Sequence, residues 1–317
     1  MIKIRNKKAA FIVNSILPAL IYGVFFFFLP VENHQDIGKY LENLQSVDQI
    51  VRISQMNFWS PIDLIRYSPA WYGIAYFSTL YADPILIISC FRFIIGFSIS
   101  FFVFYSFPPT LEGKLSGLSV LIVPIVVNHM NEHLRQGFAA SLFLFGIISR
   151  SKYIKYTLYA AAALFHPVVV FYYVVFSLSK CISIIKVSSG LKLVIVIVFS
   201  AIIVMALKFY LSSSDALYAS QYDVNSTKRS MVGLLFWISI LIIMMFSEKK
   251  WVLNNISSIF FVAIMAILYH LFEQSFRLIQ TVLPVIAVAA WRLPNINKGL
   301  FFLALFIFSS YAWFLKI

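Results

Sequence analysis

The sequence predicts an all-α polytopic membrane protein, and three observations lead to that fold class. First, 61% of the 317 residues are hydrophobic and only 12% are charged, whereas soluble domains carry about 25% charged residues. Second, the mean hydropathy is +0.89. Third, runs such as 193–211 and 300–315 are continuously apolar, without strict alternation, and approach the roughly 17 to 25 residues that a spanning helix needs. We therefore expect about 10 to 11 hydrophobic helices, some of them short or re-entrant.

The expected helices follow one another along the whole chain. They are residues 9–28, 69–81, 84–107, 115–127, 137–149, 157–179, 193–211, 231–246, 256–272, 278–291 and 300–315. The first follows a basic start, is too long for a signal-peptide core and has no small-residue cleavage site after it, so we expect a retained helix. Residues 69–81 are too short to cross alone, and His166-Pro167 interrupts 157–179, where proline removes a helical donor. Both segments are therefore predicted to be re-entrant.

The orientation is predicted from the positive-inside rule, because Lys and Arg in short loops remain in the cytoplasm. In the preferred arrangement the N-terminus is cytoplasmic and 157–179 forms a hairpin that turns near His166 on the outer side. Fifteen of the 25 basic residues but only two of the 12 acidic residues then lie inside. A single crossing of 157–179 would move five of these lysines outside. The hairpin is therefore the better arrangement.

The chain is expected to form a single integral membrane domain over residues 1–317, with outer loops at about 31–68, 128–136, 212–230 and 273–277. The net charge of +13 is spread over short cytoplasmic segments that face an anionic leaflet. No aromatic-interleaved basic domain accompanies it, so no nucleic-acid partner is expected. Cys90 and Cys181 lack the spacing of a redox or metal motif.

The most informative segment is the polar stretch 128–136, which lies between two short apolar runs. Polar groups near the bilayer are costly and usually functional. If the stretch is one helix, Arg135 lies one turn from Glu132, and residues three and four apart share a face. That face carries His129, Glu132, His133 and Gln136. The alternatives are a solvated turn, or a Glu132 that merely neutralises Arg135.

The same stretch permits a zinc site. His129, Glu132 and His133 have the H-x-x-E-H spacing, with two imidazoles one turn apart and a carboxylate that serves as general base. A third protein ligand would have to come from the outer side. The residues available for it are Asp215, Asp223, Glu273, His166 and His270. A five-residue match without that ligand is weak, so a metal-independent site is preferred.

The segment also resembles a known family. Arg135-Gln136-Gly-Phe-Ala139 is similar to the arginine-glutamine-x-x-alanine signature of the EpsG-type branch of the Wzy-like bacterial polysaccharide polymerases. Three further places agree in order and spacing with that family's D-x-x-x-Y, phenylalanine-histidine and late-arginine motifs. They are Asp36 to Tyr40, Phe165-His166 and Phe276-Arg277.

What the resemblance implies is a glycosyltransferase of O-antigen, capsule or exopolysaccharide biosynthesis. Such polymerases lie in the bacterial inner membrane with the active site facing the periplasm or cell exterior. They move a growing glycan from undecaprenyl diphosphate to a new lipid-linked repeat unit. The implied partners are that lipid-linked oligosaccharide, the bilayer, and the flippase and chain-length regulator of the same pathway.

The resemblance also suggests which side chains bind the donor. Its diphosphate is anionic, and planar guanidinium forks bind phosphate oxygens bidentately. Arg135 and Arg277 are therefore the expected diphosphate clamp. Weaker candidates are Arg229, Lys228 and Arg92, of which Arg92 has the alternative of pairing with Asp83 or with a carbonyl.

Glycosyl transfer needs a group that takes the proton of the acceptor hydroxyl, and a histidine or carboxylate can do so. The expected catalytic residues are His166, Glu132 and His133, although His166 could also be a structural histidine. The expected substrate-positioning residues are Asp36, Tyr40, Gln136, Glu273 and Arg229. No cofactor is expected, because arginines can neutralise the leaving diphosphate.

Three other functions stay open. A membrane O-acyltransferase of the same glycan pathway would place a histidine at the cytoplasmic entrance, where none is predicted. A flippase would show two similar halves, and the sequence shows none. A zinc-dependent membrane hydrolase would use His129, Glu132 and His133.

Overall fold

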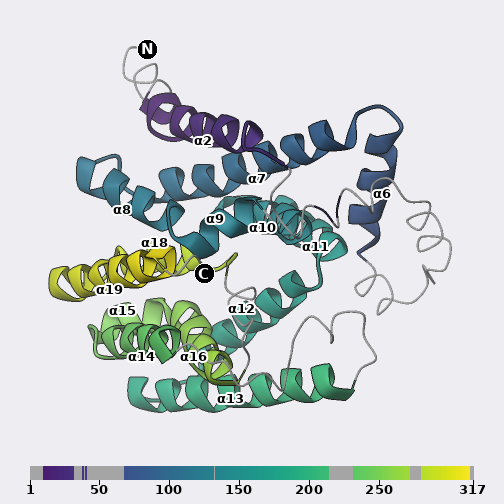
Figure 1. Cartoon of the computed structure of the whole chain (residues 1–317). Helices are drawn as coiled ribbons and strands as arrows, with labels where there is room; N and C mark the ends of the chain where they lie inside the picture. Colours follow the sequence, from purple (N-terminus) through teal and green to yellow (C-terminus); the bar gives the residue numbers. More distant parts are fainter. Residues whose placement is uncertain are drawn as a thin grey trace. The chain divides into compact units, whose positions relative to one another are not determined.

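The computed structural model describes residues 10–31, 38, 40, 68–131, 133–213, 231–271 and 280–314. Every regular element in these ranges is a helix (Figure 1). In chain order they are η1 (Ile12–Ile16), α2 (Leu17–Phe27), α6 (Pro69–Thr79), α7 (Pro84–Ser106), α8 (Leu111–Leu121), α9 (Pro124–Asn131), α10 (Leu134–Ile148), α11 (Lys152–Phe165), α12 (Val168–Ile184), α13 (Ser189–Ser213), α14 (Met231–Met245), α15 (Lys249–Asn254), α16 (Ile256–Leu271), α18 (Leu283–Ala290) and α19 (Asn295–Phe314). The all-α prediction is confirmed for the described chain.

Three described helices are long and apolar enough to cross a membrane: α7, α13 and α19. The pair α8 and α9 makes a fourth candidate if it is one span bent by 65°. In the most apolar 18-residue window, 61% of α7 is buried, against 22% for α13 and 28% for α19. The exposed sides of α13 and α19 are apolar, which suits contact with lipid. These helices indicate a membrane protein, while the number of crossings and their orientation stay predictions.

The described chain divides into two compact units. The first holds residues 1–117 and 127–173, and the second holds 118–126 and 174–317. The single membrane domain remains a prediction, and the two units are described separately below.

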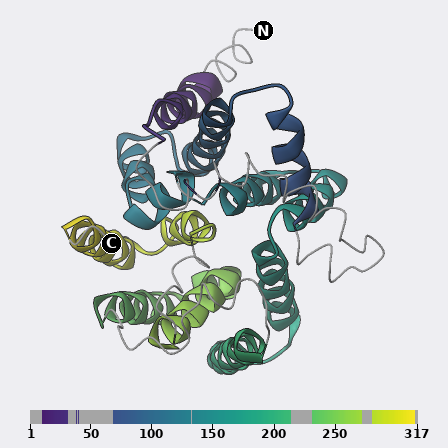
Figure 2. The same ribbon diagram turned by 45° about the vertical axis from the view of Figure 1, so that its right-hand side comes forward.

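The first unit is built on α7. Asp83 caps this helix by accepting a hydrogen bond from the Ile85 N–H at 2.8 Å, and Pro84 occupies its first turn, where no N–H partner is needed. Helix α2 runs beside α7 (Figures 1 and 2), and glycine lets the two approach closely. A Cβ on Gly96 would lie 3.0 Å from the Phe26 ring. Helix α10 packs on α7 as well, and α11 packs on α10.

The second unit is centred on α16, which packs against both α13 and α14. Helix α14 also packs on α19, where the rings of Phe236 and Phe308 stack with centroids 4.3 Å apart. The Trp251 indole N–H donates to the Ala289 carbonyl at 3.1 Å and joins α15 to α18. This unit contains none of the predicted site residues that the structure describes.

The predicted break at His166-Pro167 is confirmed, because α11 ends at Phe165 and α12 begins at Val168. A second break was not predicted. Residues 115–127 are not one helix, because α8 ends at Leu121 and Pro124 starts α9 in a new direction. Proline removes a backbone donor and clashes with the preceding turn, which explains the bend.

Candidate functional site

The polar stretch 128–136 is a break between two helices. Helix α9 ends at Asn131 and α10 begins at Leu134. His133 has φ −91° and ψ 59°, which are not helical, and its N–H lies 3.4 Å from the Asn128 carbonyl that accepts it. The expectation of one continuous helical face is therefore wrong.

Gly137 allows this break to close tightly. Its N–H donates to the His133 carbonyl at 2.7 Å. A Cβ at this position would lie 3.0 Å from the His129 carbonyl oxygen and 2.9 Å from the Ile95 side chain on α7. The first turn of α10 can therefore approach the last turn of α9 only because residue 137 has no side chain.

Most described polar side chains of the break are buried. His129, Asn131, His133 and Gln136 are all less than a tenth exposed, and Arg135 is half-buried. A solvated turn is therefore not what these residues form. Buried polar groups need partners inside the protein or in a ligand, so the break is the polar centre of the first unit.

His166 belongs to the same centre. It lies in the break between α11 and α12, outside both helices, and interacts electrostatically with Arg135, His129 and His133. Burial, then the charge of Arg135 and smaller electrostatic effects of His129 and His133, hold the pKa of the His166 imidazole well below its usual value. His166 is therefore neutral at physiological pH.

The hydrogen bond of His166 fixes which nitrogen carries the proton. Its Nδ1 accepts the Val168 N–H at 3.2 Å. A neutral imidazole that accepts at Nδ1 carries its hydrogen on Nε2. His166 can then donate from Nε2 but has no lone pair left to take a proton. Its geometry suits substrate positioning better than proton transfer, so His133 and Glu132 stay the predicted candidates for a general base.

A chain of aromatic rings connects separate motifs within the first unit. The ring of Tyr40 lies 5.5 Å from Trp71, and Trp71 lies 5.0 Å from Phe91. Phe91 lies 5.8 Å from Phe138, which lies 4.7 Å from Phe165. The structure thus links Tyr40, the start of α10 and the residue before His166.

Arg92 is fully buried and donates to backbone carbonyls. Its Nε donates to the Asn131 carbonyl at 3.0 Å, and its Nη1 donates to the carbonyls of Leu29 and Pro30 at 3.0 and 3.2 Å. Of the alternatives considered for Arg92, carbonyl pairing is confirmed. Asp83 instead caps α7.

Several predicted site residues lie outside the described residues. They are Glu132, Arg277, Asp36, Glu273, Arg229 and Lys228. The joint clamp of Arg135 and Arg277 therefore stays a prediction. The ring-bearing residues Trp71 and Phe91 were missed, because their role depends on contacts between distant segments. Arg92 did carry a signal, since it is a charge inside a long apolar run.

The described residues contain no group of three His, Cys, Asp or Glu side chains that could hold a metal ion. His129 and His133 lie on the two sides of the helix end, so they do not have the one-turn helical relation of the H-x-x-E-H motif. Glu132 lies outside the described residues.

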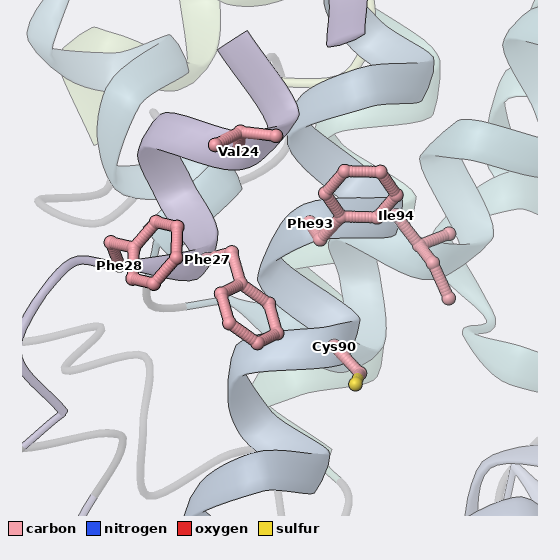
Figure 3. Close-up of a pocket in the computed structure, with 6 residues that line it drawn as sticks. All are labelled: Val24, Phe27, Phe28, Cys90, Phe93 and Ile94. Atoms are coloured by element: carbon pink, nitrogen blue, oxygen red, sulfur yellow. The ribbon is translucent and has the colours of Figure 1, made fainter. Parts of the chain in front are cut away.

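An apolar groove lies between α2 and α7 (Figure 3), with a volume of about 490 Å³. The side chains of Val24, Phe27 and Phe28 line one wall, and those of Cys90, Phe93 and Ile94 line the other. Its lining exposes no polar surface. The groove suits hydrocarbon, and no predicted site residue lines it.

No family model, no curated protein and no solved structure matches this chain.

Proposed function

We propose that the protein is a polysaccharide polymerase of the bacterial inner membrane. It transfers a growing glycan from undecaprenyl diphosphate to a new lipid-linked repeat unit at the outer face. The proposal rests on the resemblance to the EpsG-type Wzy-like family and on the polar centre of the first unit.

The observation that carries the proposal is the position of Arg135. It is the second residue of α10, where the helix N-terminus already has partial positive charge. An anion bound at this point would meet both the guanidinium of Arg135 and the partial positive charge of the helix N-terminus. Arg135, His129 and His133 all act electrostatically on His166, so the histidines are candidates for further donors to the same anion. A diphosphate leaving group is the anion that this arrangement suits.

The proposed reaction uses these residues in distinct roles. The acceptor hydroxyl oxygen attacks the anomeric carbon of the donor glycan, and the bond from that carbon to the diphosphate oxygen breaks. His133 or Glu132 takes the hydroxyl proton. The diphosphate leaves with the bonding electron pair and is stabilised by Arg135, while the Nε2–H of His166 positions the substrate.

Deletion of the gene tests the proposal directly in cells. The surface polysaccharide of the deletion strain should run on a gel as core plus one repeat, where the parent gives a ladder. A complementing copy should restore the ladder. An unchanged ladder would contradict the polymerase and would favour an O-acyltransferase of the same pathway.

Chelation separates the polymerase from a zinc hydrolase. The purified polymerase should keep its activity in chelator, and His129→Ala should lose less activity than Arg135→Ala. Loss of activity on chelation, followed by recovery with zinc, would contradict the arginine-based site.

A further inference from the structure

Arg92 is a charged side chain buried in the middle of the first unit. It is 0% exposed inside the 23-residue helix α7. Burial of a charge carries a desolvation penalty, and an apolar side chain of similar size is often at least as stable in such a place. Charged groups within spanning segments are rare and usually functional. The presence of an arginine at this position therefore points to a role that leucine or methionine could not fill.

The hydrogen bonds of Arg92 connect the ends of two helices, α9 and α2, that are far apart in sequence. Asn131 is the last residue of α9, and Leu29 and Pro30 follow the end of α2. The carbonyl of Asn131, at the end of α9, has no partner inside its own helix, and a cation stabilises such a carbonyl. One planar guanidinium donates to both ends at 3.0 to 3.2 Å. It thereby sets the position of the α9 end relative to the end of α2.

The end of α9 leads directly into the candidate site. Asn131 comes directly before the break that carries His133 and Arg135. The preceding residue on α7, Phe91, belongs to the ring chain that links Tyr40 to Phe165. Two adjacent residues of α7, Phe91 and Arg92, thus contact the ring chain and the break respectively.

We infer that Arg92 is a positioning residue, whose guanidinium fixes the α9–α10 break and so the placement of Arg135 and His133. The inference rests on the proposed function for its effect on catalysis. Lysine cannot replace Arg92, because a single ammonium lacks the planar fork that reaches carbonyls in different directions.

Lys114 on α8 offers a matched control in the same unit. Its Nζ donates to the Asn14 carbonyl and lies 5.3 Å from the centre of the Phe104 ring, near the other end of α7. Like Arg92, it is a cation that donates a hydrogen bond to a backbone carbonyl of a helix far away in sequence. It contacts no predicted site residue through these interactions, so its removal should leave the break intact.

The first readout needs no enzyme activity. Asn131→Cys, in protein without Cys90 and Cys181, places a thiol at a position that is only 6% exposed. Alkylation in detergent should be slow in this parent, at least tenfold faster with Arg92→Met, and unchanged with Lys114→Met. Equal rates in all three proteins would overturn the positioning role. Because the assay measures only the break, its result holds even if polymerase activity is absent.

The second readout is kinetic. Arg92→Met should lower kcat at least tenfold and change KM less, because the substrate still meets Arg135 but in a displaced position. Lys114→Met should change kcat less than twofold. If Arg92→Met does not fold, Arg92→Lys should give the same two effects in smaller size. Parental alkylation and parental kcat in a folded Arg92→Lys protein would overturn the inference.

Discussion

Two substitutions of His166 separate the role of its Nδ1 acceptor from the role of its Nε2–H donor. Asparagine carries its side-chain oxygen near the place of Nδ1, so it can still accept the Val168 N–H that His166 accepts at 3.2 Å. Glutamine carries its amide nitrogen near the place of Nε2, so it can still donate where the substrate is expected. Each variant therefore keeps one function of the histidine and loses the other.

The expected magnitudes follow from these two losses. His166→Asn loses the Nε2–H donor, and removal of one preorganised donor costs about 2.7 to 4 kcal/mol, or roughly a hundredfold or more in kcat. His166→Gln loses the acceptor at the start of α12, and loss of such a cap costs about 0.5 to 2 kcal/mol of stability. The asparagine variant should be stable and nearly inactive. The glutamine variant should be less stable and keep activity within about tenfold of the parent.

The assay uses purified protein in lipid nanodiscs. The initial rate of undecaprenyl diphosphate release gives the activity, and thermal unfolding gives the stability. A higher activity in His166→Asn than in His166→Gln would refute the donor role of Nε2. His166 would then serve only to cap α12.

Three further predictions follow from the same geometry. Because the pKa of His166 is lowered in the folded protein, the unfolded chain binds more protons than the folded chain below about pH 6.5. The free energy of unfolding should therefore decrease as the pH is lowered, by up to about 1.4 kcal/mol per pH unit. Thermal melting between pH 7 and 5 should show a smaller decrease in His166→Asn. Gly137→Ala should lower the free energy of unfolding in urea by about 1 to 3 kcal/mol, because its Cβ would lie 2.9 Å from the Ile95 side chain on α7. Gly190→Ala is the control, because a Cβ there would meet nothing within 4 Å, and it should leave the free energy of unfolding unchanged. Tyr81→Cys should react with an impermeant thiol reagent in spheroplasts and Tyr153→Cys should not, although the tyrosines are equally exposed at 87% and 88%; labelling of residue 153 would reverse the orientation.

The helices were predictable because their signal is local. Each apolar run is long enough to show its helical state without knowledge of its partners. The interruption at Pro167 was recognised for the same reason. Pro124 gives a weaker signal, because apolar residues flank it on both sides, whereas the polar His166 precedes Pro167.

The break at His133 was not predictable from local signals. No proline marks it, and it depends on the close approach of Gly137 to the His129 carbonyl and to Ile95. Arg135 and His133 do act electrostatically on His166 in the first unit, while the roles predicted for these three residues stay predictions. The partners of Arg92 lie 39 to 63 residues away in the chain. Only the folded structure reveals contacts of that range.

The most direct test of the polymerase is a reconstitution with a lipid-linked repeat unit. Purified protein should convert undecaprenyl-diphosphate oligosaccharide into a ladder and release one undecaprenyl diphosphate for each new linkage. Arg135→Lys keeps the charge but loses the planar fork, so its rate should fall roughly a hundredfold. Arg150→Lys is the matched control, because Arg150 is exposed just beyond the other end of α10. The account predicts a parental rate for Arg150→Lys, whereas a parental rate for folded Arg135→Lys, or a parent protein that forms no ladder, would contradict it.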